Sequence, residues 1–204
     1  MKRENYMNRI VTPHFELYLK NKLGINEDNL LRLLPLINIQ QVNKNDFLIR
    51  EGDNSRYEFF VERGLLRSYT IDQDGKHHII QFAPENSFIS DRSNVYLNEP
   101  SMSFIEAIED SYVIKLDHKY NEFVKDICMY KEYNEIILNK YIRNLEGRVN
   151  GLLAARAKDR YLQFISLYSK ISVRVPQWMI ASYLGITRET LSRVRKELAA
   201  NNYS

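Results

Sequence analysis

Apolar residues near the carboxyl end of the chain recur at the spacing of two short helices joined by a tight turn. The first helix is predicted to begin at Pro176, because the missing N–H of proline costs nothing at the first helical position. Gly185 is expected to end it, since a residue just past a helix end often takes a positive φ angle. The buried stripe between them has three- and four-residue spacing and comprises Met179, Ile180, Tyr183 and Leu184.

The second helix of this pair presents a polar face beside its apolar stripe. Thr187 is a good N-cap for it, and an acidic residue follows in the first turn. Its inward stripe comprises Leu191, Val194 and Leu198, which leaves five polar residues outward: Arg188, Glu189, Ser192, Arg193 and Lys196. Arginine pairs bidentately with guanine O6 and N7, and glutamate accepts from cytosine N4, so this face suits a DNA major groove. The alternative is an ordinary amphipathic surface helix with solvated charges.

Short β-rich runs alternate with turn signals between Ile39 and Leu116. Asp74-Gly75 is a strong two-residue hairpin signal. The clearest runs are residues 57–62, 65–71, 78–82, 104–107 and 112–116. Roughly eight strands with turns about every 8–12 residues favour a sandwich or barrel, and a double-sheet jelly roll is the natural candidate.

Helical patterns flank this β-rich region. One short helix is predicted to start at the cap pair Thr12-Pro13 and to end at Gly24, and another runs from near Asn26 to Pro35. After Asp117 the pattern stays helical, with a hinge expected near residues 154–157. A helix is predicted from about 158 to 169, with four apolar residues packing under the carboxyl-terminal helix pair: Tyr161, Leu162, Ile165 and Leu167.

A heptad pattern marks the long helical segment. Its apolar seam, spaced four, three, four and three residues, consists of Leu138, Ile142, Leu145, Val149 and Leu152. The other faces of this segment are polar, which favours pairing with a second copy of the chain. The alternative is a core helix that lies on the β-rich region.

Two parts of the chain resemble a known family. TRETLSR, which begins at Thr187, closely resembles the recognition-helix signature of the cyclic-AMP receptor protein/fumarate–nitrate regulator superfamily of bacterial transcription factors. The REGD at Arg50–Asp53 and the spacing of Gly64 and Gly75 resemble the β-roll of the same superfamily. The resemblance implies that three residues read base edges: Arg188, Glu189 and Arg193.

The resemblance implies an α+β fold in three parts. An N-terminal double-stranded β-helix, or jelly-roll sensor, is expected at residues 1–117, a dimerisation helix with hinge at 118–156 and a helix-turn-helix at 157–204. Only six residues follow Leu198, too few for the β-hairpin wing that family members usually add, so we expect a reduced or absent wing. Four further residues are expected to contact phosphates or to fix the register on DNA: Gln177, Thr187, Ser192 and Lys196.

The effector pocket of the family is degenerate here. The resembled cyclic-nucleotide cassette has a Gly-Glu pair facing the ribose and, about ten residues later, an Arg-Ser pair on the phosphate. The corresponding segment here is FISDRSNVYLNEPSMSFIEA, Phe88–Ala107. Ser90-Asp91 stands where the Gly-Glu pair belongs, and Ser101-Met102 stands where the Arg-Ser pair belongs. A buried phosphate without its arginine would be costly. Asp91 and Arg92 are expected to be surface or local ion-pair residues, although an Arg92 that compensates from another direction stays open.

The charge distribution and the cysteine content narrow the range of functions and cellular locations to be considered. Residues 155–204 hold nine Lys+Arg against three Asp+Glu, whereas residues 1–154 hold 20 against 23, a basic end on a slightly acidic body. The single cysteine excludes an internal disulfide framework. Neither a signal-peptide core nor a membrane span is evident, so we expect a soluble cytoplasmic protein. His77 and His78 point to opposite faces of a predicted strand, so no metal site or other cofactor is expected.

The sequence therefore predicts a homodimeric, sequence-specific DNA-binding transcription regulator rather than an enzyme. Two-fold pairing predicts a pseudo-palindromic operator, and RNA polymerase is a further expected partner. The small-molecule effector is unknown and is expected to differ from cyclic AMP. Two alternatives stay open: a cyclic-nucleotide-responsive regulator with a rearranged pocket, and a ligand-binding module whose C-terminal helices dock a protein partner.

Overall fold

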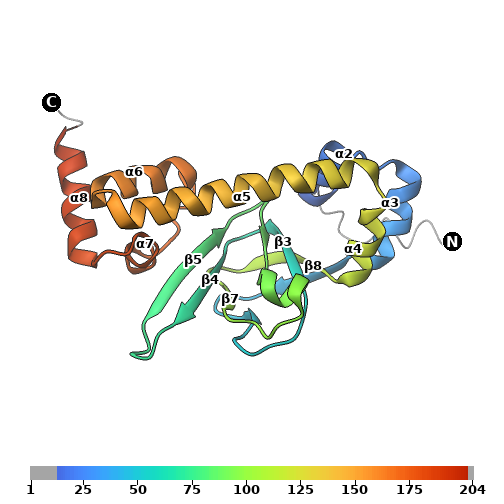
Figure 1. Ribbon diagram of the computed structural model, residues 1–204, viewed down its shortest axis with the longest axis horizontal. Helices are drawn as coiled ribbons and strands as arrows, with labels where there is room; N and C mark the ends of the chain where they lie inside the picture. The colour runs from blue at the N-terminus through green and yellow to red at the C-terminus, as the bar shows by residue number, and fades with distance from the viewer. Residues whose placement is uncertain (1–12, 202–204) are drawn as a thin grey trace. The chain divides into compact units, whose positions relative to one another are not determined.

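The computed structural model describes residues 13–201 (Figure 1). The chain divides into two compact units, Met1–Ser68 with Phe82–Ile136 and Tyr69–Gln81 with Ile137–Ser204. The domain boundaries expected from the sequence stay a prediction.

Eight strands in the described part of the chain form two four-stranded sheets. One sheet has the order β1-β8-β3-β6 and the other the order β2-β7-β4-β5. The strands are β1 (Asn38–Val42), β2 (Phe47–Ile49), β3 (Glu58–Arg63), β4 (Leu66–Ile71), β5 (His77–Ala83), β6 (Phe88–Ile89), β7 (Phe104–Ala107) and β8 (Ser111–Leu116). This is the antiparallel double-sheet architecture that the turn spacing predicted, so the fold class is confirmed.

Strand β3 serves two apolar cores, because successive side chains of a strand point to opposite faces. Phe59 and Val61 enter the core between the sheets, whereas Phe60 belongs to the core on the outer face. Helices α2 (Pro13–Leu23), α3 (Glu27–Leu33) and α4 (His118–Lys125) close that outer core. Their buried side chains there are Phe15, Leu19, Leu23, Leu30, Leu33, Tyr120 and Val124.

The N-terminal helix boundaries follow the predicted signals. The N-cap of α3 is Asn26, whose side-chain oxygen accepts from the main-chain N–H of Asn29 at 2.9 Å. A short 3₁₀ helix, Leu34–Leu36, follows at the predicted stop around Pro35. The predicted cap residue Thr12 lies outside the described residues.

Helices α6 (Ala157–Leu167), α7 (Gln177–Leu184) and α8 (Arg188–Asn201) gather at the carboxyl-terminal end of α5 (Cys128–Ala154) (Figure 1). Between α5 and α6 the chain is non-helical at residues 155 and 156, where the hinge was expected. No helix in the described residues is long and apolar enough to cross a membrane. Because α8 runs to Asn201 and residues 202–204 lie outside the described part, the reduced wing stays a prediction.

The predicted packing face of α6 was wrong in two positions. Leu162 and Leu167 are 46% and 52% exposed, whereas Tyr161 and Phe164 are buried. Successive residues of a helix are rotated by about 100°. Phe164 therefore lies within about 60° of Tyr161, whereas Leu162 and Leu167 lie about 100° and 120° from it, on opposite flanks of the buried row.

The hairpin between β4 and β5 forms with a different turn from the one predicted. Gly75 N–H donates to the carbonyl of Asp72 at 3.0 Å, which makes Gln73 and Asp74 the central residues of the turn. Gly75 follows them with φ +76°. A turn followed by a left-handed glycine is a common three-residue hairpin loop. Like the predicted two-residue Asp-Gly turn, it is compatible with the right-handed twist of the two strands.

Candidate nucleic-acid interface

The turn between α7 and α8 depends on Gly185. Its φ is +64°, and its N–H donates to the carbonyl of Ser182 while that of Ile186 donates to Ala181 at 3.0 Å. This pair of bonds is the Schellman arrangement that satisfies the last carbonyls of a helix. The left-handed angle favours glycine, and a Cβ at residue 185 would also lie 2.9 Å from Leu152 Cδ2 and displace that side chain. Pro176 is the N-cap of α7, one position before the predicted one.

The start of α8 is fixed by Thr187. Its Oγ1 accepts from the N–H of Thr190 at 3.2 Å, which is the predicted capping bond. The pKa of the Glu189 carboxyl is lowered, first by a bond from its own N–H and then by the Thr187 hydroxyl. Glu189 is therefore an anion at the helix end that favours negative charge.

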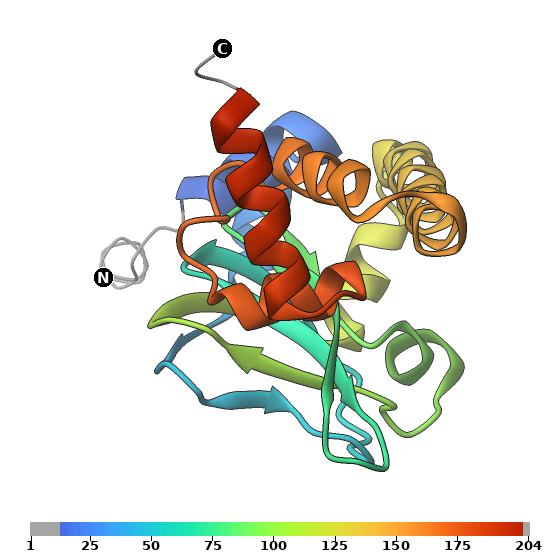
Figure 2. The same ribbon diagram turned by 90° about the vertical axis from the view of Figure 1, so that its left-hand side faces the viewer.

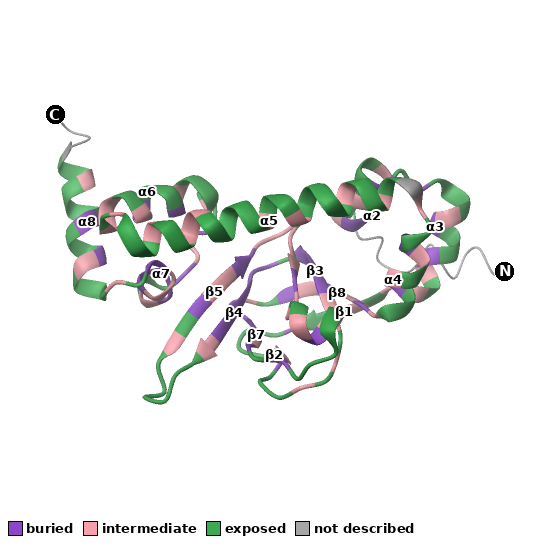
Figure 3. Cartoon of the chain, in the orientation of Figure 1, coloured by how far each residue is buried: buried purple, intermediate pink, exposed green. Residues whose placement is uncertain are grey.

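The polar face of α8 that is expected to contact DNA, here called the recognition face, is exposed to solvent. The side chains that were expected to contact DNA are all exposed: Gln177, Thr187, Arg188, Glu189, Ser192, Arg193 and Lys196. Leu191 and Val194 are buried on the opposite stripe, as predicted, and Leu198 is half-buried. Figure 2 shows the length of α8, and Figure 3 shows that its exposed residues run along it. The three base-reading candidates, Arg188, Glu189 and Arg193, are thus all solvent-exposed within the first two turns of α8.

Aromatic side chains hold the helix pair on α6. The ring centroids of Phe164 and Tyr183 lie 5.5 Å apart, and Tyr168 meets Tyr183 edge-on at 5.7 Å. The Lys158 ammonium also pairs with the Glu197 carboxylate at 2.7 Å, which links α6 to α8. These contacts fix the orientation of the recognition face relative to α6.

The β4–β5 hairpin contacts α7 within the second unit. The Ser182 hydroxyl donates to the carbonyl of His77 at 2.6 Å and accepts from the N–H of Ile79 at 3.0 Å. A groove of about 800 Å³ runs beside this contact, with Lys76, Trp178 and Arg188 among the residues that line it. Sequence reasoning missed this contact, because the two segments are more than 100 residues apart.

Arg148 is a second residue that sequence reasoning missed. It projects from α5, and its guanidinium donates to the main-chain carbonyls of Ile79, Ile80 and Tyr183. One side chain thus joins α5, β5 and α7. In the sequence it is one of several arginines on a polar helix.

The apolar seam of α5 is exposed along its length (Figure 3). The exposed fractions are 43% for Ile142, 38% for Leu145, 53% for Val149 and 42% for Leu152, and Leu138 is half-buried. These side chains form an apolar row that the described residues leave uncovered.

The cassette that resembles a nucleotide site is held together by Asp91. Its Oδ2 accepts from the hydroxyls of Ser101 at 2.9 Å and Ser103 at 3.0 Å, and from the N–H of Met102 at 3.0 Å. Its Oδ1 accepts from the N–H of Ser93 at 3.1 Å. Partial burial, the largest single cause, raises the pKa of Asp91, but the hydrogen bonds from Ser101, Ser103 and the main-chain N–H groups of Asn94 and Met102 together outweigh it, and the pKa is lowered. Asp91 is therefore a half-buried anion and not the surface residue that was expected.

The side chains of the remaining cassette residues have other surroundings, although the main-chain N–H of Asn94 also donates to Asp91 Oδ1 at 3.4 Å. Ser90 is half-buried, and Arg92 is exposed, with its guanidinium 4.6 Å from the centroid of the Tyr96 ring. Asn94, which the sequence did not single out, is buried in the π-helical turn Ser93–Leu97. Its amide donates to the carbonyls of Asp53 and Glu99 and accepts from the N–H of Arg56. The donors of the cassette are thus used within the chain.

Neither histidine of the hairpin sits in a metal-type cluster. His77 stacks on Tyr69 with ring centroids 4.5 Å apart, and His78 Nε2 lies 2.6 Å from Asp72 Oδ2. Within the described residues, no group of three or more His, Cys, Asp or Glu side chains is placed to hold a metal ion.

Comparison with known proteins gives consistent matches. The cyclic nucleotide-binding domain family matches residues 39–124. The chain is 24% identical over 186 residues to the "Anaerobic regulatory protein" of Haemophilus influenzae, covering 83% of this chain and 70% of that protein. It is 25% identical over 186 residues to the "Fumarate and nitrate reduction regulatory protein" of Vibrio cholerae, covering 83% and 72%.

Solved structures share the fold. FixK2 from Bradyrhizobium japonicum matches with a TM-score of 0.70 and 21% identity, covering 81% of this chain and 86% of that one. A CooA mutant from Carboxydothermus hydrogenoformans matches with a TM-score of 0.67 and 18% identity, covering 88% of each. The similarity extends from the β-sandwich through the long helix to the carboxyl-terminal helices.

Proposed function

We propose that the chain is a member of the cyclic-AMP receptor protein/fumarate–nitrate regulator superfamily and acts as a homodimeric, sequence-specific DNA-binding transcription regulator; the matches to the cyclic nucleotide-binding domain family and to the regulatory relatives support this. The observation that carries the proposal is the exposed recognition face on a helix whose start is capped and whose opposite stripe is buried. Such a helix enters a major groove with its amino-terminal residues on the base edges.

The proposed roles follow from chemistry and position. Arg188, Glu189 and Arg193 read bases, because guanidinium and carboxylate groups match guanine and cytosine edges. Lys196 and Ser192 contact phosphates, and Gln177 meets the backbone at the start of α7. Thr187 fixes the register, since its side-chain oxygen is already used in the cap.

The apolar seam supports a two-fold dimer. Two copies paired along α5 would present two recognition helices to a pseudo-palindromic operator, with half-sites about 34 Å apart, one turn of DNA. RNA polymerase stays an expected partner, and a cytoplasmic location follows from the DNA target.

The effector is proposed to be something other than a cyclic nucleotide. A cyclic phosphate needs hydrogen-bond donors and a compensating cation, and Asp91 already places a carboxylate on Ser101, Met102 and Ser103. Two anions in one small site repel each other. Isothermal calorimetry with cyclic AMP and cyclic GMP is expected to show no saturable heat, and micromolar binding would support the alternative of a rearranged pocket.

Selection of duplexes from a random pool tests the proposed function. We expect an enriched pseudo-palindrome whose affinity for the full chain falls steeply with salt, because phosphate contacts release counterions. A chain that binds no duplex at low salt, or binds all duplexes equally, would refute sequence-specific regulation and favour a module that docks a protein.

A further inference from the structure

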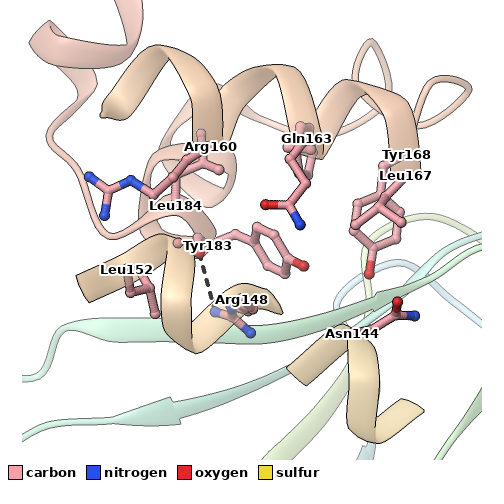
Figure 4. Close-up of a pocket in the computed structure, with 11 residues that line it drawn as sticks. Asn144, Arg148, Leu152, Arg160, Gln163, Leu167, Tyr168, Tyr183 and Leu184 are labelled. Atoms are coloured by element: carbon pink, nitrogen blue, oxygen red, sulfur yellow. Dashed lines mark hydrogen bonds between the residues drawn. The ribbon is translucent and has the colours of Figure 1, made fainter. Parts of the chain in front are cut away.

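A cavity of about 270 Å³ lies between the carboxyl-terminal half of α5 and the helices α6 and α7, all within the second unit (Figure 4). Its volume is close to the lower end of small-molecule sites, which hold about 300–1,000 Å³. Figure 4 shows Gln163 and Tyr168 extending from α6 toward α5, with Arg148 and Asn144 on the opposite wall and Tyr183 between them.

The cavity carries positive charge without a matching acid. Arg148 and Arg160 line it, and no aspartate or glutamate does. The hydrogen-bond partners of Arg148 are neutral carbonyls, so its charge is not compensated. The Nε atoms of both arginines are buried and have no hydrogen-bond partner among the described residues. Both side chains are half-buried. A partly desolvated cation and a buried unpaired donor both cost free energy, and an anion in the cavity would reduce both costs.

The remaining walls suit an apolar body with a few polar contacts. Phe164, Leu167 and Leu184 line the cavity, together with the ring of Tyr183. Gln163 adds an amide, which both donates and accepts hydrogen bonds. Apolar walls with a few placed polar groups are the usual composition of a ligand site.

Leu152 belongs both to the cavity wall and to the apolar seam, but the other α5 residues that line the cavity lie on a different side of the helix from the seam. Successive residues of an α-helix are rotated by about 100°, so Asn144, Arg148 and Gly151 lie roughly a quarter to a third of a turn from the row through Leu145 and Val149. Pairing along the seam therefore leaves this face to α6 and α7.

We propose that this cavity binds a small organic anion, an acid with one carboxylate or phosphate group and an aromatic or aliphatic body. Such a ligand would contact α5, α6 and α7 together and would fix the helix-turn-helix against the dimer helix. Its regulatory effect rests on the proposed DNA-binding function, whereas the binding itself does not.

Binding of simple probes to the full chain tests the proposal. Phenylacetate and phenyl phosphate carry the two kinds of acid, and 2-phenylethanol is their neutral counterpart. We expect saturable calorimetric binding of at least one acid and at least tenfold weaker binding of the alcohol, because charge-assisted bonds to arginine are the strong contacts here. No saturable binding of either acid, or equal binding of the alcohol, would overturn the proposal.

Two glycines of α5 provide a matched pair of variants. A Cβ at Gly151, which lines the cavity, would meet only Gln163 Oε1 at 3.7 Å and Arg160 Cγ at 3.8 Å. A Cβ at Gly147, which does not line it, would meet only Gln163 Nε2 at 3.6 Å. Both positions tolerate a side chain and gain helix propensity. Gly151→Leu is expected to abolish probe binding and Gly147→Leu to retain it.

A charge variant completes the test. Arg160→Gln is expected to weaken the acids at least tenfold and to leave the alcohol unchanged. Unchanged probe affinity in Gly151→Leu, or in a folded Arg160→Gln, would place the ligand elsewhere. Operator binding is measured on the same samples without probe. A failure of the DNA-binding hypothesis can therefore be distinguished from a failure of the anion-binding proposal.

Discussion

The guanidinium carbon of Arg148 lies 4.1 Å from the centroid of the Tyr183 ring, and its Nη2 donates to the main-chain carbonyl of Tyr183 at 3.2 Å. The same group binds the carbonyls of Ile79 and Ile80 on β5. Removing the Arg148 side chain would leave these three carbonyls without their donor. Water cannot fully replace it where the carbonyls are shielded from solvent.

Arg148→Met is therefore expected to lower the free energy of unfolding by about 2–4 kcal/mol, since it leaves three acceptors without a donor. Arg148→Lys should recover only part of this, because an ammonium lacks the planar fork that reaches several carbonyls. Urea unfolding measures both. Arg143→Met, on an exposed position of α5, is the control, and an equal loss there would contradict the special role of Arg148.

Two variants of α8 should separate base reading from phosphate contact. Arg193→Ala is expected to cost about 1–3 kcal/mol on the selected operator and to relax discrimination at one base pair. Lys196→Ala should weaken all duplexes similarly and reduce the salt slope by about one unit. Fluorescence anisotropy on specific and scrambled duplexes across a salt series distinguishes them. Equal losses for Arg193→Ala on both duplexes would contradict its role.

Charge in the apolar seam should break the dimer. Leu145→Glu places a carboxylate in each half of the pairing surface, and the expected rise in the dimer dissociation constant is about a hundredfold or more. Analytical ultracentrifugation over a concentration series measures it. Asn139→Glu adds the same charge to an exposed position off the seam and should leave the dimer intact. A monomeric wild-type chain would contradict the dimer hypothesis.

Glu58 should make stability depend on pH. Burial raises the pKa of this carboxyl to about 7, although the charge of Arg92 opposes the rise. The other groups that interact with it are phenols, on Tyr18, Tyr96, Tyr120 and Tyr130. The folded chain therefore keeps a proton that the unfolded chain releases near pH 4.5. Stability falls as pH rises from about 4.5 to about 7, and above that the penalty is complete.

Glu58→Gln is expected to remove this dependence. At pH 8 the variant should be more stable than the wild type by roughly 1–3 kcal/mol, and at about pH 4 the two should agree. Thermal unfolding between about pH 4 and 8 measures the difference. Glu51→Gln, at an exposed turn position, is the control. A wild-type chain that gains stability over this range relative to the Glu58→Gln variant would reverse the sign and refute the assignment.

Local signals in the sequence sufficed for the elements and for the recognition face. Gly185 marks its turn because a left-handed angle selects glycine, and the outward set on α8 follows from the spacing of Leu191 and Val194. These inferences depend on neighbours within one or two helical turns. The resemblance to the superfamily likewise depended on a short motif, and the comparisons agree with it: the cyclic nucleotide-binding domain family matches residues 39–124, and a relative that is 24% identical is named as a regulatory protein.

Long-range contacts and their consequences could not be predicted. Nothing local to Arg148 or Ser182 indicates the hairpin that each contacts, because that hairpin is about 70 and 105 residues away. The α6 face was misassigned because Leu162 and Leu167 are apolar yet lie off the buried row. Asp91 was placed in the right cassette, but which donors its carboxylate would reach depends on how two loops fold back on each other.

The Asp91 carboxylate is part of the chain, so it is present in the site whatever the concentrations of metabolites in the cell. The hydroxyls of Ser101 and Ser103 therefore donate to the same acceptor, Asp91 Oδ2, under all nutritional conditions. If the pocket is closed to cyclic nucleotides, as proposed above, a change in the concentration of a second messenger would leave these hydrogen bonds unchanged, and the loop would serve as a fixed structural support.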